Sequence, residues 1–395
     1  MPYALSPSDL SELPAFRRRL HRSPEISGAE RQTAALIAST LAALGATGIE
    51  TGIGGHGVTG FFEGAEDGPL VLLRAELDAL PILEQTGLNY ASEREGWAHL
   101  CGHDGHMTAL IGVAKALAQR PPARGRVGLL FQPAEETGQG AAAMVQDPRL
   151  ADLRPAAIFA QHNLPGLLLG KVALRAGPVA CASCGLKIAL RGRPAHASQP
   201  ETGLSPRAAL SDLLDALDQL NARVPIDDAG FAMATITHCA MGAPAFGISP
   251  GAADIWVTLR TLEDARMTEL RSRAEAIARQ IADRHGLEVD LSDHDVFAST
   301  VNDPAAVDLL RGALDACGIA HSEHGQPWRP SEDFGQFAAL GPVAMMFTGA
   351  GEDHAPLHDP AYDFPDDLTP IAVRAFLSAI ALTLGDDRPQ TQGGQ

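Results

Sequence analysis

The stretch "PLVLLRAELDALP", residues 69–81, joins a short apolar run to acidic residues and a closing proline. A run of this length between turn signals is typical of a strand buried on both faces of a sheet. The same plan returns in "RVGLLFQPAEE" (126–136) and "AAIFAQHNLP" (156–165), and "PVAMMFTGAG" (342–351) is a fourth apolar run. Because helical segments alternate with these runs, the sequence predicts an α/β fold around a largely parallel sheet flanked by helices.

Further segments extend this pattern toward both ends of the chain. Residues 7–45 have helical spacing, and residues 50–63 alternate around glycines in a way that predicts a hairpin. In open α/β sheets, ligands gather at the carboxyl ends of the strands. The acids and the histidine that follow the apolar runs fall at those ends, so we expect a functional site there.

Residues 182–290 have a different rhythm. Strand-like and helix-like segments follow one another in the order β-α-β-β-α-β, which is the split, ferredoxin-like arrangement. The α/β pattern resumes after this segment. We therefore predict a discontinuous outer domain of residues 1–181 and 291–395 with an inserted α+β domain at 182–290, and a disordered polar tail, "GDDRPQTQGGQ".

The chain has 395 residues and a formal net charge of −18, from 30 basic and 48 acidic side chains. This charge disfavours binding to nucleic acid and to anionic membranes, so we expect neither partner. No apolar run reaches the ~18 residues of a membrane span, and the N-terminus lacks a secretory pattern, so we expect a cytoplasmic protein. Five cysteines argue against a disulfide framework. "CASC" (181–184) has the spacing of a redox or zinc pair, but no second pair accompanies it, which favours ordinary thiols.

The stretch "HLCGHDGHMTAL", residues 99–110, concentrates three histidines, a cysteine and an aspartate. Cysteine thiolate and neutral imidazole are good ligands for zinc-like metals, so Cys101 and His103 are candidate ligands. The neighbouring His99, Asp104 and His106 are candidates for partners that support the ligands. Taken alone, the stretch is also compatible with a polar loop that carries an incidental thiol.

Other candidates follow the predicted strands. In "QPAEETG", one of the adjacent carboxylates Glu135 and Glu136 can bind a metal while the other serves as a general base. Either could equally belong to a solvated acidic turn, and His162 and His358 could each be an ordinary histidine. Together with Cys101 and His103, however, they supply enough donors at one rim for a two-metal hydrolase site.

Ordered motifs along nearly the whole chain resemble the aminoacylase-like amidohydrolases, which include hippurate hydrolases, indole-acetyl-amino-acid hydrolases and N-acyl-L-amino-acid deacylases. The motifs are "RRRLHRSPEISGAERQT", "LLRAELDALPI", "HLCGHDGHMTAL", "FQPAEETGQGA", "QHNLPG", "GRPAHASQPETGLSP", "WVTLRT", "SEDFGQF" and "APLHDPAYDFPDD". The resemblance implies a zinc-exopeptidase-like fold and two divalent metal ions per subunit, which in this family are manganese, zinc, cobalt or nickel.

The resemblance also implies roles for single residues. Cys101, His103, Glu136, His162 and His358 would hold the two metals, with the Cys101 thiolate bridging them. Glu135 would be the general base, taking a proton from a metal-bridging water that attacks the amide carbonyl and handing a proton to the leaving amine. Asp78 would steady the site as an acid behind the ligands.

The insert resembles the lid and dimerisation domain of this family, which implies a homodimer or higher homo-oligomer. His196 would stabilise the oxyanion and bind substrate in its own site or in that of a partner subunit. Arg260 is either a partner for the substrate carboxylate or a structural arginine. Two residues depart from the family pattern: Glu76 stands where an aspartate is usual, and Gly247 stands where an asparagine usually helps to hold the substrate.

We therefore expect a metal-dependent amidohydrolase that cleaves small-molecule N-acyl amino acids, with acetyl, benzoyl or related acyl groups, to a carboxylate and a free amino acid. The alternatives are a dipeptidase or carboxypeptidase on the same dinuclear site, a cysteine hydrolase that uses Cys101 as nucleophile, and a ligand-binding relative without turnover. The presence of Glu135 and of all five donor residues argues against the last alternative.

Overall fold

A computed structural model of the protein describes residues 3–386. Nearly all of the tail that the sequence predicts to be disordered lies outside the described residues. The chain forms two compact units: the second comprises Ala180–Thr300 and Pro327–Glu332, and the first comprises the rest of the described chain. The domain boundary that the sequence suggests at residue 290 falls inside strand β13 (Glu288–Phe297), and the whole of this strand belongs to the second unit.

The first unit is built on an eight-stranded mixed sheet with the strand order β1-β2-β4-β3-β5-β16-β6-β15. Its central strands β4, β3, β5 and β16 are parallel neighbours, which confirms the predicted α/β fold with a largely parallel sheet. The strands of this sheet are β1 (Thr47–Ile53), β2 (Gly57–Glu63), β3 (Glu66–Glu76), β4 (Arg124–Gln132), β5 (Ala157–Pro165), β6 (Val172–Ala173), β15 (His321–Ser322) and β16 (Val343–Gly351). The chain also forms the short strands β7 (Gly177–Ala180) and β14 (Thr300–Asn302).

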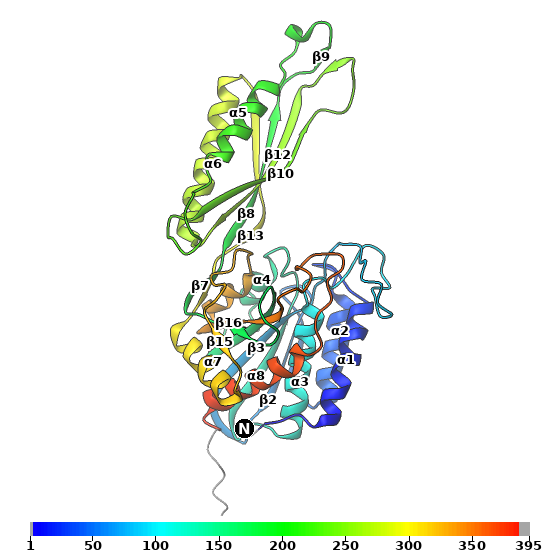
Figure 1. The fold of residues 1–395 in the computed structure, drawn as a ribbon, viewed down its shortest axis with the longest axis vertical. Helices are drawn as coiled ribbons and strands as arrows, with labels where there is room; N and C mark the ends of the chain where they lie inside the picture. The colour runs from blue at the N-terminus through cyan, green and yellow to red at the C-terminus, as the bar shows by residue number, and fades with distance from the viewer. Residues whose placement is uncertain (1–2, 387–395) are drawn as a thin grey trace, which may run out of the picture. The chain divides into compact units, whose positions relative to one another are not determined.

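Helices pack on this sheet and on one another. They are α1 (Pro7–Arg22), α2 (Arg31–Ala43), α3 (His103–Gln119), α4 (Gly140–Val145), α7 (Pro304–Cys317), α8 (Leu368–Leu384) and the 3₁₀ helix η2 (Asp333–Ala339). The helices α3 and α8 contact β3 at the centre of the sheet, and α1, α2 and α3 lie side by side (Figure 1). The predicted helical region 7–45 is thus two helices, since Pro24 disfavours helical backbone at Ser23, where α1 ends.

The first helix is joined to α3 by a buried ion-pair cluster. The Arg17 guanidinium lies 2.9 Å from Asp104 and 2.6 Å from Asp366, and its side chain is fully buried. An oxygen of the Asp104 carboxylate also lies 2.9 Å from Nδ1 of His21. Asp104, a candidate supporting residue in the sequence, therefore anchors α1 to the start of α3.

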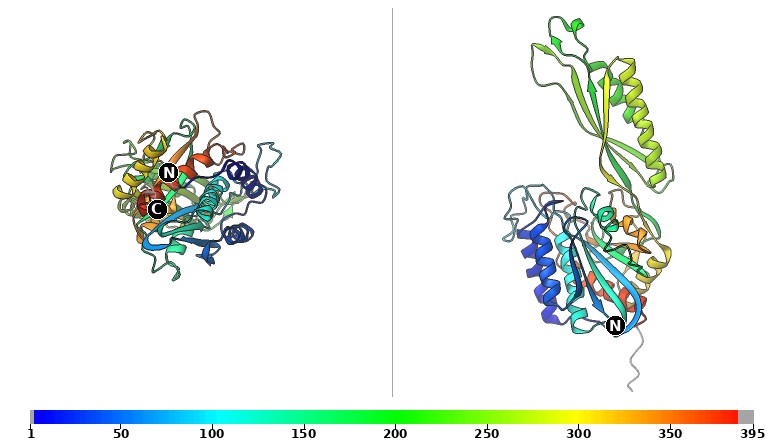
Figure 2. Two further views of the ribbon diagram at one scale, coloured as in Figure 1. Left: turned by 90° about the horizontal axis from the view of Figure 1, so that it is seen from below. Right: turned by 180° about the vertical axis from the view of Figure 1, so that it is seen from behind.

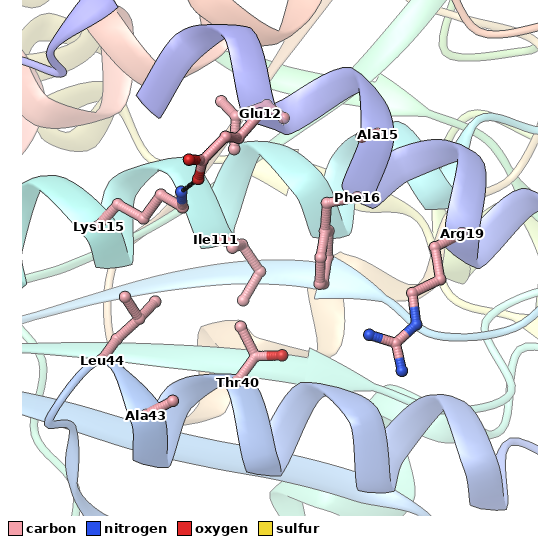
Figure 3. Close-up of a pocket in the computed structure, with 10 residues that line it drawn as sticks. Glu12, Ala15, Phe16, Arg19, Thr40, Ala43, Leu44, Ile111 and Lys115 are labelled. Carbon is pink, nitrogen blue, oxygen red and sulfur yellow. Dashed lines mark hydrogen bonds and ion pairs between the residues drawn. The ribbon is translucent and has the colours of Figure 1, made fainter. Parts of the chain in front are cut away.

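A groove of about 380 Å³ lies where α1 and α2 diverge over α3 (Figure 3). Its floor is apolar, with Phe16, Leu44 and Ile111, and Lys115 pairs with Glu12 at its rim. None of the candidate site residues lines this groove. Helices α1 to α3 can also be followed from behind in Figure 2.

The second unit is a four-stranded antiparallel sheet in the order β10-β12-β8-β13. Its elements are β8 (Ala182–Arg191), α5 (Arg207–Asp218), β10 (Ala232–Met241), β12 (Ala252–Thr261), α6 (Asp264–Arg284) and β13. Both helices cover one face of this sheet (Figure 1). This arrangement is the predicted ferredoxin-like one. Between β8 and β12 the chain also forms η1 (Pro200–Thr202) and a two-stranded ladder of β9 (Ala195–His196) and β11 (Ile248–Ser249).

In the part of the chain that the structure describes, no helix has both the length and the apolar character needed to cross a membrane.

Candidate functional site

The candidate residues of the first unit converge at the carboxyl ends of its central strands. Asp78 lies two residues after β3, Glu135 and Glu136 follow β4, and His162 lies near the end of β5. His103 is the first residue of α3, and Cys101 precedes it by two positions. Since parallel strands end at one edge of a sheet, this topology brings together residues that are far apart in the sequence.

The donor atoms of this cluster lie within metal-ligand reach of one another. Sγ of Cys101 is 3.4 Å from Nε2 of His162. Oε1 of Glu136 is 3.8 Å from Nε2 of His103, and Oε2 of Glu136 is 3.6 Å from Nε2 of His358. Cys101 belongs to two groups of three donors, one with His103 and His162 and one with Glu136 and His358. The Cys101 sulfur therefore lies within 4.8 Å of a donor atom of each of the other four predicted ligands.

Asp78 holds two of these donors in place. Its backbone carbonyl lies 2.8 Å from Nδ1 of His103, which directs the other ring nitrogen, Nε2, toward Glu136. Its carboxylate accepts hydrogen bonds from the Glu136 backbone N–H at 3.0 Å and from the Ser27 hydroxyl at 2.7 Å. Groups of this kind fix the orientation of metal-binding side chains.

The residues present fit a pair of metal ions. Nε2 of His103 is buried and has no hydrogen-bond partner within the described chain, although a buried ring nitrogen normally has one. The surrounding donors are a thiol, imidazoles and carboxylates, which is a ligand set that suits zinc-like transition metals.

The electrostatics of the cluster also point to cations. Burial alone would lower the pKa of His103, but Asp78 and the carboxylates of Glu76 and Glu136 raise it to about 10. Burial, together with Glu136 and Glu135, raises the pKa of the Cys101 thiol well above its ordinary value. The carboxylates thus place negative charge around His103 and Cys101, which bound divalent cations would neutralise.

Two other histidines are predisposed to be neutral ligands. Partial burial lowers the pKa of His358 to about 4, with a smaller contribution from His103, although 48% of the side chain is exposed. Burial and the neighbouring His106 lower the pKa of His162 well below its ordinary value. Neutral imidazole is the form that binds metal.

Backbone strain accompanies the site. Within residues 3–386, only three residues other than glycine have positive φ, and two of them are Ala134 at 49° and His358 at 66°. Ala134 directly precedes Glu135, and its N–H donates to Glu30 at 2.8 Å. Residues in such conformations cost free energy and cluster at functional sites.

The two glycines of "CGHDGH" allow α3 to approach its neighbours closely. A Cβ at Gly102, whose φ is +98°, would lie 2.2 Å from Oδ1 of Asn163. A Cβ at Gly105 would lie 2.4 Å from the ring of Phe364. The glycines therefore set the spacing between the start of α3, β5 and the segment after β16.

The second unit carries the remaining candidates, at a distance along the chain from the cluster. His196 is exposed on β9, pairs in register with Ile248, and has Nδ1 2.7 Å from the Ser198 hydroxyl. A Cβ at Gly247 would meet no atom within 4 Å, and the adjacent Phe246 is 106% exposed. Gly247 therefore lies in an open loop, and the asparagine side chain of the family pattern is absent there.

Arg260 lies on β12, where its guanidinium donates to the Ser331 hydroxyl at 2.9 Å. Burial lowers its pKa. Among residues 3–386 no carboxylate lies within ion-pair distance of it. A half-buried guanidinium without a carboxylate partner in the described chain can donate hydrogen bonds to the carboxylate of a bound ligand.

Sequence reasoning did not single out several polar residues around the cluster, among them Arg74, Asn163 and Tyr362. Asn163 and Tyr362 lie inside motifs that the sequence already showed, "QHNLPG" and "APLHDPAYDFPDD". Their only signal was position, one residue after His162 and four after His358. Their partners come from other elements and could not be read from spacing.

Comparisons with known proteins find relatives over nearly the whole chain. The family model described as peptidase family M20/M25/M40 matches residues 72–381. The chain is 32% identical over 388 residues to an N-acetyl-L-cysteine deacetylase of Bacillus subtilis, covering 96% of this chain and 90% of the relative. It is 33% identical over 359 residues to a hippurate hydrolase of Campylobacter jejuni, covering 90% and 92%.

A solved structure is also similar to this chain over nearly its whole length. The chain is similar, with a TM-score of 0.79 and 27% identity, to a dinuclear metal-binding peptidase of the M20 family from Bacillus subtilis. The match covers 96% of this chain and 99% of that one.

Proposed function

Because the chain belongs to peptidase family M20/M25/M40, a family of hydrolases, we propose that it is a metal-dependent amidohydrolase that cleaves N-acyl amino acids to a carboxylate and a free amino acid. The observation that carries this proposal is the cluster at the carboxyl ends of the sheet. There, five metal-type donors lie together, and a further carboxylate that can move a proton, Glu135, lies beside two of them, His103 and Glu136. The names of the similar deacetylase and hippurate hydrolase support an amide of an amino acid as the substrate.

The two divalent ions would be held by Cys101, His103, Glu136, His162 and His358. Such ions supply an activated water and polarise an amide carbonyl. Manganese, zinc, cobalt and nickel are the metals to be compared, since thiolate and imidazole donors suit ions of this kind.

Glu135 is our candidate for the proton-transfer residue. Its Oε2 lies 3.9 Å from Nε2 of His103, so its carboxylate borders the donor cluster. In this role it accepts a proton at its carboxylate and delivers one to the leaving amine. Asp78 acts behind the donors, through the contacts that orient His103 and Glu136.

The second unit supplies the substrate contacts in this proposal. His196 donates a hydrogen bond to the oxygen that becomes negative during amide cleavage. Arg260, which has no carboxylate partner within residues 3–386, binds the carboxylate of the amino acid. We further propose that the second unit mediates a homodimer or higher homo-oligomer. A cytoplasmic location is also proposed, and it agrees with five cysteines that are all free thiols.

The test is release of free amine from a panel of acetyl, benzoyl and long-chain N-acyl amino acids, with dipeptides included. The protein is stripped of metal and then reloaded with manganese, zinc, cobalt or nickel. We expect turnover only after reloading, and preference for N-acyl amino acids over dipeptides. Turnover that survives stripping would contradict the metal-dependent function and favour Cys101 as a nucleophile. Preference for dipeptides would instead assign a dipeptidase.

A further inference from the structure

Four buried polar side chains next to the donor cluster are joined in a chain of hydrogen bonds. Nδ1 of His106 is 2.7 Å from Oε2 of Glu76, and Nε2 of His106 is 2.6 Å from Oδ1 of Asn163. The Asn163 amide donates to the Tyr362 hydroxyl at 2.6 Å. Each of these four residues is at most 1% exposed. No member is among the predicted metal ligands, and we refer to the four residues as the relay.

The relay joins four parts of the first unit that the sequence separates. Glu76 ends β3, His106 lies in the first turns of α3, Asn163 lies on β5, and Tyr362 lies in the segment after β16. Buried polar groups that all find partners rigidify the elements that carry them. The relay therefore fixes these four parts relative to one another.

Two of these parts carry metal donors next to a relay member. The Asn163 backbone carbonyl lies 2.7 Å from Nδ1 of His162, so Asn163 also sets the ring that points Nε2 at Cys101. The His106 ring packs edge-on against the His162 ring, with centroids 4.9 Å apart. Tyr362 belongs to the same short segment as His358, whose backbone is in the left-handed region.

The carboxylate of Glu76, at one end of the relay, has favourable charged and hydrogen-bonding partners. Burial alone would raise the pKa of Glu76, but Arg74 and His106 hold it well below the ordinary value. Arg74 pairs with Glu76 and also donates to Gln132 at 2.7 Å and to Asp333 at 3.0 Å. An ionised carboxylate at this depth is stable only with such partners. Glu76 is thus a firm anchor for His106.

We propose that Glu76, His106, Asn163 and Tyr362 are positioning residues that hold His162 and His358 at the spacing needed to bind the two metal ions. The inference rests on the proposed function only for the identity of the ligands. It assigns a purpose to Glu76 and Tyr362, which act on the ligands through His106 and Asn163.

The experiment measures Co²⁺ affinity by calorimetry and follows the thiolate-to-cobalt absorption band of Cys101. The variants are Tyr362→Phe and Glu76→Gln, with Glu76→Asp to restore a carboxylate on a shorter stem. The control is Tyr3→Phe, which also removes one buried hydroxyl, here bonded to Asp386 at 2.5 Å and outside the relay. We expect Tyr362→Phe and Glu76→Gln to weaken Co²⁺ binding about 10- to 100-fold and Glu76→Asp to recover part of the loss. The control should match the wild type.

Equal Co²⁺ affinity of Tyr362→Phe and the wild type would overturn the proposal, even if Glu76→Gln fails to fold. Equal weakening by the Tyr3→Phe control would also overturn it, since the loss would then reflect general stability. Because the readout needs no substrate, a wild type that binds two ions but hydrolyses no N-acyl amino acid would refute only the proposed function. A wild type that binds no Co²⁺ would refute both.

Discussion

The donor cluster of the first unit and the loop around His196 in the second are built in opposite ways. In the cluster, most donors are buried, although His358 is exposed, and Asp78 fixes His103 through its backbone carbonyl and the Glu136 backbone N–H through its carboxylate. Around His196, a two-residue ladder carries exposed side chains, and the side chain of Phe246 is fully exposed. Rigid, compensated placement suits metal binding and proton transfer, whereas an exposed loop suits contact with a group that comes and goes. The comparison supports the proposal that metal binding and proton transfer belong to the first unit, while the second unit supplies His196 and Arg260 as contacts to the substrate.

The largest effect expected in the first unit follows from Glu135→Gln. The amide cannot take a proton, so kcat should fall about 10²- to 10⁴-fold on the best N-acyl amino acid. Metal content, measured by mass spectrometry, should remain that of the wild type, and the exposed Glu66→Gln in the same unit is the control. Loss of metal together with activity would show that Glu135 is a ligand and not the base.

Replacing His196 by alanine tests the oxyanion contact proposed for the second unit. Because a lost oxyanion donor costs about 10²- to 10³-fold, kcat should fall by that factor while metal content and thermal stability are kept. The exposed His294→Ala in the same unit should leave kcat unchanged. Unchanged kcat in His196→Ala would confine the chemistry to the first unit entirely.

Arg260→Met tests substrate recognition by the second unit, because it separates an effect on substrate binding from an effect on the chemical step. Since a hydrogen bond to a charged group contributes about 1.5–3 kcal/mol, KM for an N-acyl amino acid should rise roughly 10- to 100-fold. For the matching N-acyl amino acid amide, which lacks the carboxylate, KM should hardly change. The control is Arg191→Met, an exposed arginine of the same sheet. An equal rise for both substrates would make Arg260 a structural residue.

The smallest expected effect concerns the stability of the first unit and its dependence on pH. Burial alone would lower the pKa of His21, but hydrogen bonds to Asp104 and Glu84 raise it to about 9. The folded pKa is above the ordinary 6.5, so this stabilisation is complete below pH 6.5 and disappears as the pH rises through about 9.

His21→Gln should therefore lower the free energy of unfolding by on the order of 2 kcal/mol at pH 6, and by clearly less at pH 9.5. Urea denaturation at the two pH values measures both differences, and the exposed His324→Gln is the control. A loss that is the same at both pH values would mean that packing, and not charge, gives His21 its effect.

Much of the fold could be predicted from the sequence because each central strand is a nearly pure apolar run ended by polar residues. Buried parallel strands need that pattern on both faces, and the alternation with helices then fixes the class. The order of elements in the insert was readable for a similar reason. The predicted end of the insert at residue 290 was too early, because β13 continues to Phe297 through mostly exposed residues that lack the pattern of a buried strand.

The sequence by itself determined which residue types stand at the ends of the strands, and hence that Cys101, His103, Glu135, Glu136 and His162 share one rim. That follows from local pattern and from the geometry of parallel sheets. Which of them meet, and what holds them, only the tertiary structure decided. Glu76 meets His106, and Asn163 meets Tyr362, across sequence separations of 30 and 199 residues. Such contacts depend on how strands and helices pack, which no local spacing encodes.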